Sequence, residues 1–369
     1  MARTGAAVSG AATLGLMSGR QRPFQAKKGP YDYIIVQGHY DIWEFNDRLA
    51  LEEESQNSPL RDHLLPRLLE GGVDVVVMPA GGEAARHRIG SDQLLEGSLR
   101  STDMLLREIE KTNGKASVIR TKKDLPEKPD RNHVRFFLDF EGGDPISIPA
   151  EPGLHPDHRL ALLRHFFRVG VRGLQLTRDG RNQLGDGYLE GKGGKLSRFG
   201  VEVVEEMNRL GMMIGVSHVS ENTLLHAAEV SKKPIVSTHQ NPRHFINTLL
   251  QLSDDMIKAI AKTGGVAGVR FHSQKSTPYE KLVEMVSYVA DLAGIAHTGY
   301  AWLAHDVGLP KTAYVPGVSS GPFPGGEIEK LTKYEQNSRF IDALVKGKFA
   351  DKEISMVMGG NFLRVMREG

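Results

Sequence analysis

The sequence predicts an α/β fold in which eight parallel strands, each followed by a helix, close into a (β/α)8, or TIM, barrel. Short apolar runs of strand length recur from residue 31 onward. They are mostly continuous rather than alternating, which is typical of parallel strands covered on both faces. Amphipathic segments with helical periodicity lie between them. Eight such units in one chain fit a closed barrel better than an open sheet.

The predicted strands are rich in Val, Ile, Leu and Phe, and several end in glycine or in a polar residue. In chain order they cover residues 33–36, 73–78, 134–140, 173–176, 212–216, 234–237, 265–271 and 297–302. The short length of each run and the glycines that bound it favour strands over buried helices.

The segments between the strands carry helix start and stop residues. Serine at an N-cap accepts a hydrogen bond from the first helical turn, and glycine readily ends a helix. The caps are Ser197, Ser220 and Ser253, and the terminators are Gly211 and Gly264. Thr277-Pro278 predicts one further start, with Thr277 as the cap and Pro278 at the first helical position.

Residues 1–30 are expected to lie outside the fold, and residues 31–369 to form a single domain. The segment 6–19 is small, weakly apolar and uncharged, and it is too short to span a bilayer. It is either a disordered tail or the remnant of an export signal. Both explanations stay open, and so do an exported and a cytoplasmic location.

Composition excludes several classes of function. Lys+Arg is 47 and Asp+Glu is 45, so no net charge attracts nucleic acid or anionic lipid. The chain has no cysteine, which excludes disulfides, thiolate nucleophiles and cysteine-based zinc sites. We expect a small-molecule ligand, no nucleic acid and no membrane span.

Residues that bind metals follow four of the predicted strands. His39 and Asp41 follow the first, Glu141 the third, His218 the fifth and His239 the sixth. The carboxyl ends of parallel barrel strands open onto one face, where active sites form. A lone buried histidine or aspartate is more often structural than a ligand, but five at strand ends favour a metal centre.

The ligand types suggest zinc and a hydrolytic reaction. His39 and Asp41 are two residues apart, so both side chains point the same way from a strand. Imidazole with carboxylate suits zinc, and a carboxylate can bridge two ions. Two ions about 3.5 Å apart would hold a bridging hydroxide and polarise a carbonyl. The glycine-rich segment 191–195 lacks the spacing of a phosphate-binding loop.

Several segments resemble the membrane (renal) dipeptidase family of zinc metallopeptidases. They are Gly-His-Tyr-Asp at 38–41, Glu-Gly-Gly at 141–143, the long stretch 199–220, its continuation 230–239, and Met-Gly-Gly-Asn-Phe-Leu-Arg-Val at 358–365. The resemblance covers residues 31–366 and marks a divergent, bacterial-type member.

The resemblance implies a barrel with two Zn²⁺ ions per chain that hydrolyses dipeptides, including those with a D-residue on the C-terminal side. By this resemblance His39 and Asp41 hold one ion, His218 and His239 hold the other, and Glu141 bridges them. Family members often form homodimers, so a homodimer is expected here.

The segments that bind substrate in the family depart from its pattern. Arg178 follows Thr177 where the family has histidine. Leu250-Gln251 stands where the family has Arg-Asn, and Leu303 where it has a catalytic aspartate. The nearest candidate replacements are Asn241 and Arg243 for substrate binding, with His305 or Asp306 as the general acid.

These departures predict a metal-dependent hydrolase with a shifted substrate. Losing a charged partner for a buried group costs on the order of 2–5 kcal/mol. We expect Arg178 to bind a substrate carboxylate or a developing oxyanion, unless it turns outward to solvent. The alternatives are true dipeptidase activity, a protein that has lost peptidase activity or performs another metal-dependent biosynthetic step, and a one-metal hydrolase of cyclic amides.

Overall fold

The computed structural model describes residues 30–40, 58–82, 94–147, 158, 160–272, 278–303 and 333–369. All paired strands within these residues are parallel, and they form two sheets. The first sheet has the order β1 (Ile35–Gln37), β2 (Val73–Gly82), β4 (Val134–Glu141) and β3 (Ala116–Val118). The second runs in chain order through β5 (Gly173–Gln175), β6 (Met213–Gly215), β7 (Ile235–Ser237), β8 (Val266–His272) and β9 (Thr298–Leu303).

The two sheets join into a barrel. A parallel bridge between Leu138 and Val171 connects β4 to the start of β5. Strands β1 and β9 are also in contact, so the ring closes. Strand β3 pairs only with β4 and lies outside the ring. The eight predicted strands are therefore confirmed, and the three-residue β3 is an addition that the sequence did not predict.

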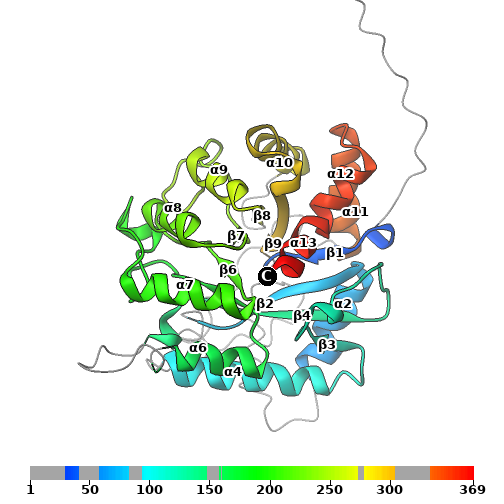
Figure 1. Cartoon of the computed structure of the whole chain (residues 1–369). Coiled ribbons are helices and arrows are strands. Elements are labelled where there is room, and N and C mark those ends of the chain that lie inside the picture. Colours follow the sequence, from blue (N-terminus) through cyan, green and yellow to red (C-terminus); the bar gives the residue numbers. More distant parts are fainter. Residues whose placement is uncertain are drawn as a thin grey trace, which may run out of the picture.

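The helices form the outer layer around the strands (Figure 1). In chain order they are α2 (Leu65–Glu70), α4 (Leu94–Glu110), α6 (Ala161–Val169), α7 (Arg198–Leu210), α8 (Glu221–Val230), α9 (Asp254–Lys262), α10 (Tyr279–Ala293), α11 (Lys333–Lys346), α12 (Asp351–Ser355) and α13 (Asn361–Glu368). Short 3-10 or π turns lie between several of them, among them Leu60–Leu64 and Tyr188–Glu190.

The predicted helix caps form as expected. The hydroxyl oxygens of Ser197, Ser220 and Ser253 each accept a hydrogen bond from the backbone amide three residues on. Gly211 ends α7 in the left-handed conformation, with a φ of 73°. The start of α10 differs from the prediction: the helix begins at Tyr279, and Pro278 occupies the N-cap position. Thr277 lies outside the described residues.

The barrel interior is filled from below by apolar side chains. Phe362 of α13 is fully buried and lies against the backbone of Gly38 and Gly299, which have no side chains to exclude it. Its cluster includes the strand residues Val36, Val75, Val77, Phe137, Met213, Val236 and Val266. Figure 1 shows α13 lying across the centre of the ring. We call this cluster the barrel floor, and "above" it means nearer to the carboxyl ends of the strands.

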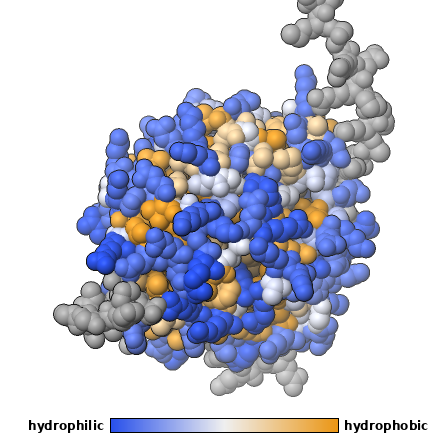
Figure 2. Space-filling view, in the orientation of Figure 1, coloured by the Kyte–Doolittle hydropathy of each residue, from blue (hydrophilic) through white to orange (hydrophobic). Residues whose placement is uncertain are grey.

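The outer face of each strand packs against the helices in a second, larger core. The face of the molecule in Figure 2 is largely hydrophilic, with scattered apolar patches. Among the described residues, no helix combines the length and the apolar composition needed to cross a bilayer. Within the described part of the chain, the buried charged side chains include Glu141 at the carboxyl end of β4, and also Asp74 of β2, Glu108 of α4 and Glu206 of α7.

Candidate metal centre

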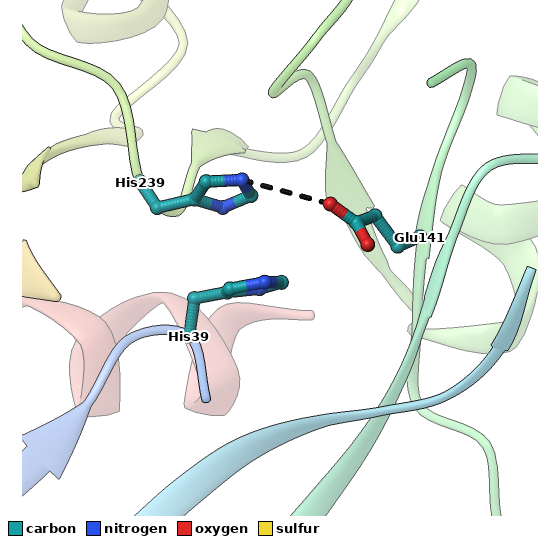
Figure 3. A group of neighbouring side chains, drawn as sticks. All are labelled: His39, Glu141 and His239. Atoms are coloured by element: carbon teal, nitrogen blue, oxygen red, sulfur yellow. Dashed lines mark ion pairs between the residues drawn. The ribbon is translucent and has the colours of Figure 1, made fainter. Parts of the chain in front are cut away.

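Three predicted ligands meet at the carboxyl ends of their strands (Figure 3). One ligand atom from each of His39, Glu141 and His239 lies within 4.8 Å of the other two, close enough to bind a single ion. All three side chains are buried. The imidazole rings of His39 and His239 stack with their centroids 3.8 Å apart. Residues 200 positions apart in the sequence therefore form one cluster, as the barrel topology predicts.

His218 belongs to the same cluster. Its Nε2 atom lies 2.8 Å from Nε2 of His239 and 3.3 Å from Oε1 of Glu141. The distance from His239 Nε2 to that same glutamate oxygen is 3.8 Å. Glu141 is thus the shared neighbour of both histidines, and its role as a bridging ligand stays a prediction.

The strand period positions Glu141. Phe137 points into the barrel floor, and every second residue of a strand faces the same side. Asp139 and Glu141 therefore also face inward, one and two steps above the floor. Asp139 accepts a hydrogen bond from Gln175 at 3.1 Å, and both side chains are fully buried. Gly173 and Gly215 leave the room that these two side chains fill.

The backbone of His218 has an unusual conformation that aims its ring. Its φ is 65°, in the left-handed region that costs a non-glycine residue on the order of 1–3 kcal/mol. The amide of Tyr188 donates to the carbonyl of His218 at 2.8 Å and helps hold this conformation. Such strain is characteristic of functional sites.

Hydrogen bonds at the Nδ1 atoms turn both Nε2 atoms toward the centre. His218 Nδ1 donates to Asp179 Oδ1 at 3.0 Å, and His239 Nδ1 lies 2.7 Å from the hydroxyl of Thr238. Glu141 Oε2 is buried and accepts no hydrogen bond within the described residues. Converging imidazole nitrogens beside an unsatisfied carboxylate oxygen suit a divalent cation, so the residues present fit the metal that their types predict.

The electrostatics of Glu141 and His239 favour the protonation states that bind a metal, whereas those of His218 favour the protonated ring. Burial alone would raise the pKa of Glu141, but Arg178, His218 and His39 lower it well below its ordinary value. Burial, with the neighbouring imidazoles, lowers the pKa of His239 well below its usual range. Burial also acts to lower the pKa of His218, but Asp179 and Glu141 outweigh it and raise the pKa. An ionised carboxylate and a neutral imidazole are the forms that bind a cation.

Arg178 faces the cluster and does not turn outward. Its Nε atom lies 3.6 Å from Glu141 Oε2, and its side chain is only 15% exposed. A guanidinium at this place puts a fixed positive charge beside the metal ligands.

Asn241 and Arg243, both predicted to bind substrate, are engaged in holding their own loop. The Nη1 atom of Arg243 lies 3.1 Å from a carboxylate oxygen of Glu221, and Nη2 donates to the carbonyl of Gln251 at 3.0 Å. Asn241 is buried, and its Oδ1 accepts from the backbone amide of Arg270 at 2.8 Å. A direct contact of either side chain with substrate stays a prediction.

Three further predicted site residues, Asp41, His305 and Asp306, lie outside the described residues. Their roles as a metal ligand and as candidate general acids therefore stay predictions.

The structure adds residues that the sequence interpretation missed. Asp179 orients His218, and the ring of Tyr188 lies 6.1 Å from that of His218. Arg270 lies at the end of β8, where its charge helps to lower the pKa of His239. The sequence did contain an indication that Arg270 is a site residue, because it is the one charged residue among the apolar residues of 265–271.

Comparisons with known proteins agree with this architecture. A metallopeptidase structure from Rhodobacter sphaeroides, solved with a phosphinate mimic of the dipeptide L-Ala-D-Ala, superposes with a TM-score of 0.73 at 18% identity. The match covers 91% of this chain and 99% of that one. At this identity the likeness establishes the fold alone, a TIM barrel.

Two curated proteins show the sequence relationship. Dipeptidase verJ of Clonostachys rogersoniana is 28% identical over 91% of this chain and 84% of its own length. Mouse Dipeptidase 3 is 32% identical over 60% of this chain, and the match spans only 44% of that protein.

The family model for membrane dipeptidases, peptidase family M19, matches residues 30–369. This match includes all four described histidine and glutamate residues of the cluster. The predicted family is therefore confirmed, and the chain belongs to the membrane dipeptidase family.

Proposed function

We propose that this protein is a two-zinc hydrolase that cleaves dipeptides or related amide bonds, and that residues 31–369 act as one catalytic domain. The observation that carries the proposal is the convergence of two imidazole Nε2 atoms, 2.8 Å apart, on the buried carboxylate of Glu141. Family membership supports a metal-dependent hydrolase with a small-molecule substrate. Dipeptidase activity in verJ and in Dipeptidase 3, as their names state, supports the amide class.

In this proposal the ligands divide between two ions. His39 and Asp41 would hold one ion, His218 and His239 would hold the other, and Glu141 would be a ligand of both. When bound, divalent ions polarise an amide carbonyl and lower the pKa of a water molecule. The protein orients the ligands, since Asp179 and the Thr238 hydroxyl fix the two imidazole rings.

The remaining residues bind and protonate the substrate. Arg178, 3.6 Å from Glu141, is placed to stabilise negative charge on the carbonyl oxygen or to bind a carboxylate. Asp306 or His305 is the proposed donor of a proton to the leaving amine. Asn241 and Arg243 hold the loop after β7, which supports His239. A homodimer is the proposed assembly.

The test is a screen of zinc-loaded protein against L,L- and L,D-dipeptides, N-acyl amino acids and cyclic amides. We expect amine release that a chelator abolishes and added zinc restores. Release from dipeptides alone would identify an ordinary dipeptidase, and release only from cyclic amides would favour the one-metal alternative. Full metal loading without hydrolysis of any amide would contradict the proposal and favour a different metal-dependent step.

A further inference from the structure

A second arginine, Arg270 of β8, faces the interior of the barrel. In β8, Val266 points into the barrel floor beside Phe362. Strand alternation puts Gly268 and Arg270 on that same interior face, one and two steps above the floor. Glu141 stands at the corresponding height on β4, two steps above Phe137. Arg270 therefore belongs to the layer of side chains that forms the metal centre.

The backbone of Arg270 is fixed. Its amide donates to Asn241 Oδ1 at 2.8 Å, and Asn241 is itself held by a 2.7 Å hydrogen bond from its amide to Gln251 Oε1. Arg270 also pairs in register with Ala301 of β9. The guanidinium therefore extends from a rigid strand end and not from a loose loop.

Tyr188 lies beside the same metal centre. Its ring centroid is 6.1 Å from that of His218, and its amide donates to the carbonyl of His218 at 2.8 Å. The amide of the next residue, Leu189, donates to the carbonyl of Asp179 at 3.0 Å, so Tyr188 lies next to the segment that carries Arg178. Its hydroxyl makes no hydrogen bond within the described part of the chain, and its side chain is half-buried.

We propose that the metal centre is built for a net-anionic amide, whose carboxylate is bound by Arg178 of the β5 end, Arg270 of the β8 end and the Tyr188 hydroxyl. This inference rests on the proposed function and names its substrate class. Two guanidiniums attract a carboxylate and repel an ammonium, and divalent ions add to the same potential. Among the described carboxylates, Glu141 pairs with Arg178 and His218, and Asp179 pairs with His218. An amide with a free carboxylate and a blocked amine, such as an N-acyl amino acid, fits this charge pattern better than a zwitterionic dipeptide.

The test measures binding separately from turnover. Calorimetry of zinc-loaded protein compares 4-oxopentanoate, in which a methylene group replaces the amide nitrogen of N-acetylglycine so that it cannot be hydrolysed, with the neutral ketone 2-pentanone. We expect the carboxylate to bind more tightly, and Arg270→Gln to lose about 10- to 100-fold of affinity for it with little change for the neutral ketone. Arg270→Lys should retain part of the preference, and Tyr188→Phe should lose less than Arg270→Gln. Arg198→Gln, an exposed arginine of α7 with a side chain 90% exposed, is the matched control.

The outcomes separate this inference from the proposed function. An unchanged preference for the carboxylate in Arg270→Gln, with zinc content and thermal unfolding as in wild type, would overturn it. Hydrolysis of free dipeptides in preference to N-acyl amino acids would also overturn it while leaving the hydrolase proposal intact. If no amide is cleaved but the carboxylate preference depends on Arg270, the proposed reaction fails and the anion site stands.

Discussion

Asp179 Oδ1 accepts a hydrogen bond from Nδ1 of His218 at 3.0 Å, from the opposite side of the ring to the metal centre. Because the proton is fixed on Nδ1, the lone pair of Nε2 is available to a cation. A hydrogen-bond acceptor on the second nitrogen of a metal-binding histidine typically accounts for about 10- to 100-fold of metal affinity.

We therefore predict that Asp179→Ala weakens zinc binding by about 10- to 100-fold, measured by competition with a chromophoric chelator. Asp179→Asn should recover part of the affinity, because an amide oxygen still accepts the Nδ1 proton. Asp103→Asn, on the exposed face of α4, serves as the control. Equal zinc affinity in wild type and Asp179→Ala would show that the contact does not orient the ligand.

The second prediction concerns Glu141, whose carboxylate is the shared neighbour of His218 and His239. Glu141→Gln should reduce the metal content of purified protein from two ions per chain toward one or none, since an amide supplies one neutral oxygen. Elemental analysis after dialysis measures this directly. A variant that still holds two ions would remove the bridging role from this residue.

Arg178 gives a prediction on turnover. Replacing it with alanine removes the guanidinium 3.6 Å from Glu141 and should lower kcat/KM by about 10- to 100-fold. If the residue stabilises charge that develops during the reaction, kcat falls; if it only binds the substrate, KM rises. Steady-state kinetics on the best substrate of the screen, with Arg198→Gln as control, distinguishes the two. Unaltered kinetics would exclude both roles.

A fourth prediction concerns stability and pH. Arg209 makes two hydrogen bonds of 2.7 Å to the carboxylate of Glu206, and Arg164 makes a third. The bond from Arg209 lowers the pKa of Glu206, burial raises it, and Arg164 lowers it further, so it lies below its ordinary value of 4.5. Glu206→Gln should therefore cost about 1–3 kcal/mol of unfolding free energy at neutral pH.

The sign of the pH dependence follows from this lowered pKa. The stabilisation by Glu206 is fully present above the unfolded value of 4.5 and is lost as pH falls through the folded value. The free energies of unfolding of wild type and Glu206→Gln, measured in urea, should thus differ at neutral pH and converge in acid, below the folded pKa of Glu206. Glu205→Gln, on the exposed side of the same helix, is the control. A difference that persists in acid would mean that the ion pairs are not its source.

Most of the fold could be predicted from the sequence because its signals are local. Continuous apolar runs gave all eight barrel strands, and the serine caps placed the starts of α7, α8 and α9. Strand β3 was missed because Ala116–Val118 contains a serine and does not form a continuous apolar run. Pro278 was predicted at the first helical position but occupies the N-cap, because the backbone conformation that sets the cap cannot be seen in the sequence.

The site was predictable where residue type alone carries the chemistry. Histidines and a glutamate at strand ends stand out, and the described ones converge. The structural role of Arg243 could not be predicted from the sequence, because its partner Glu221 belongs to α8 and only the folded chain brings the two residues together. Arg270 was hidden inside an apolar run, where its significance depends on which residues of β8 face inward.

The position of Phe362 has a consequence for the catalytic cycle. Its ring fills the space between Gly38 and Gly299, so the described residues close this end of the barrel. Substrate and products are therefore both expected to pass the carboxyl ends of the strands. Whichever product dissociates last obstructs the next molecule, so inhibition by that product is expected to be competitive with substrate.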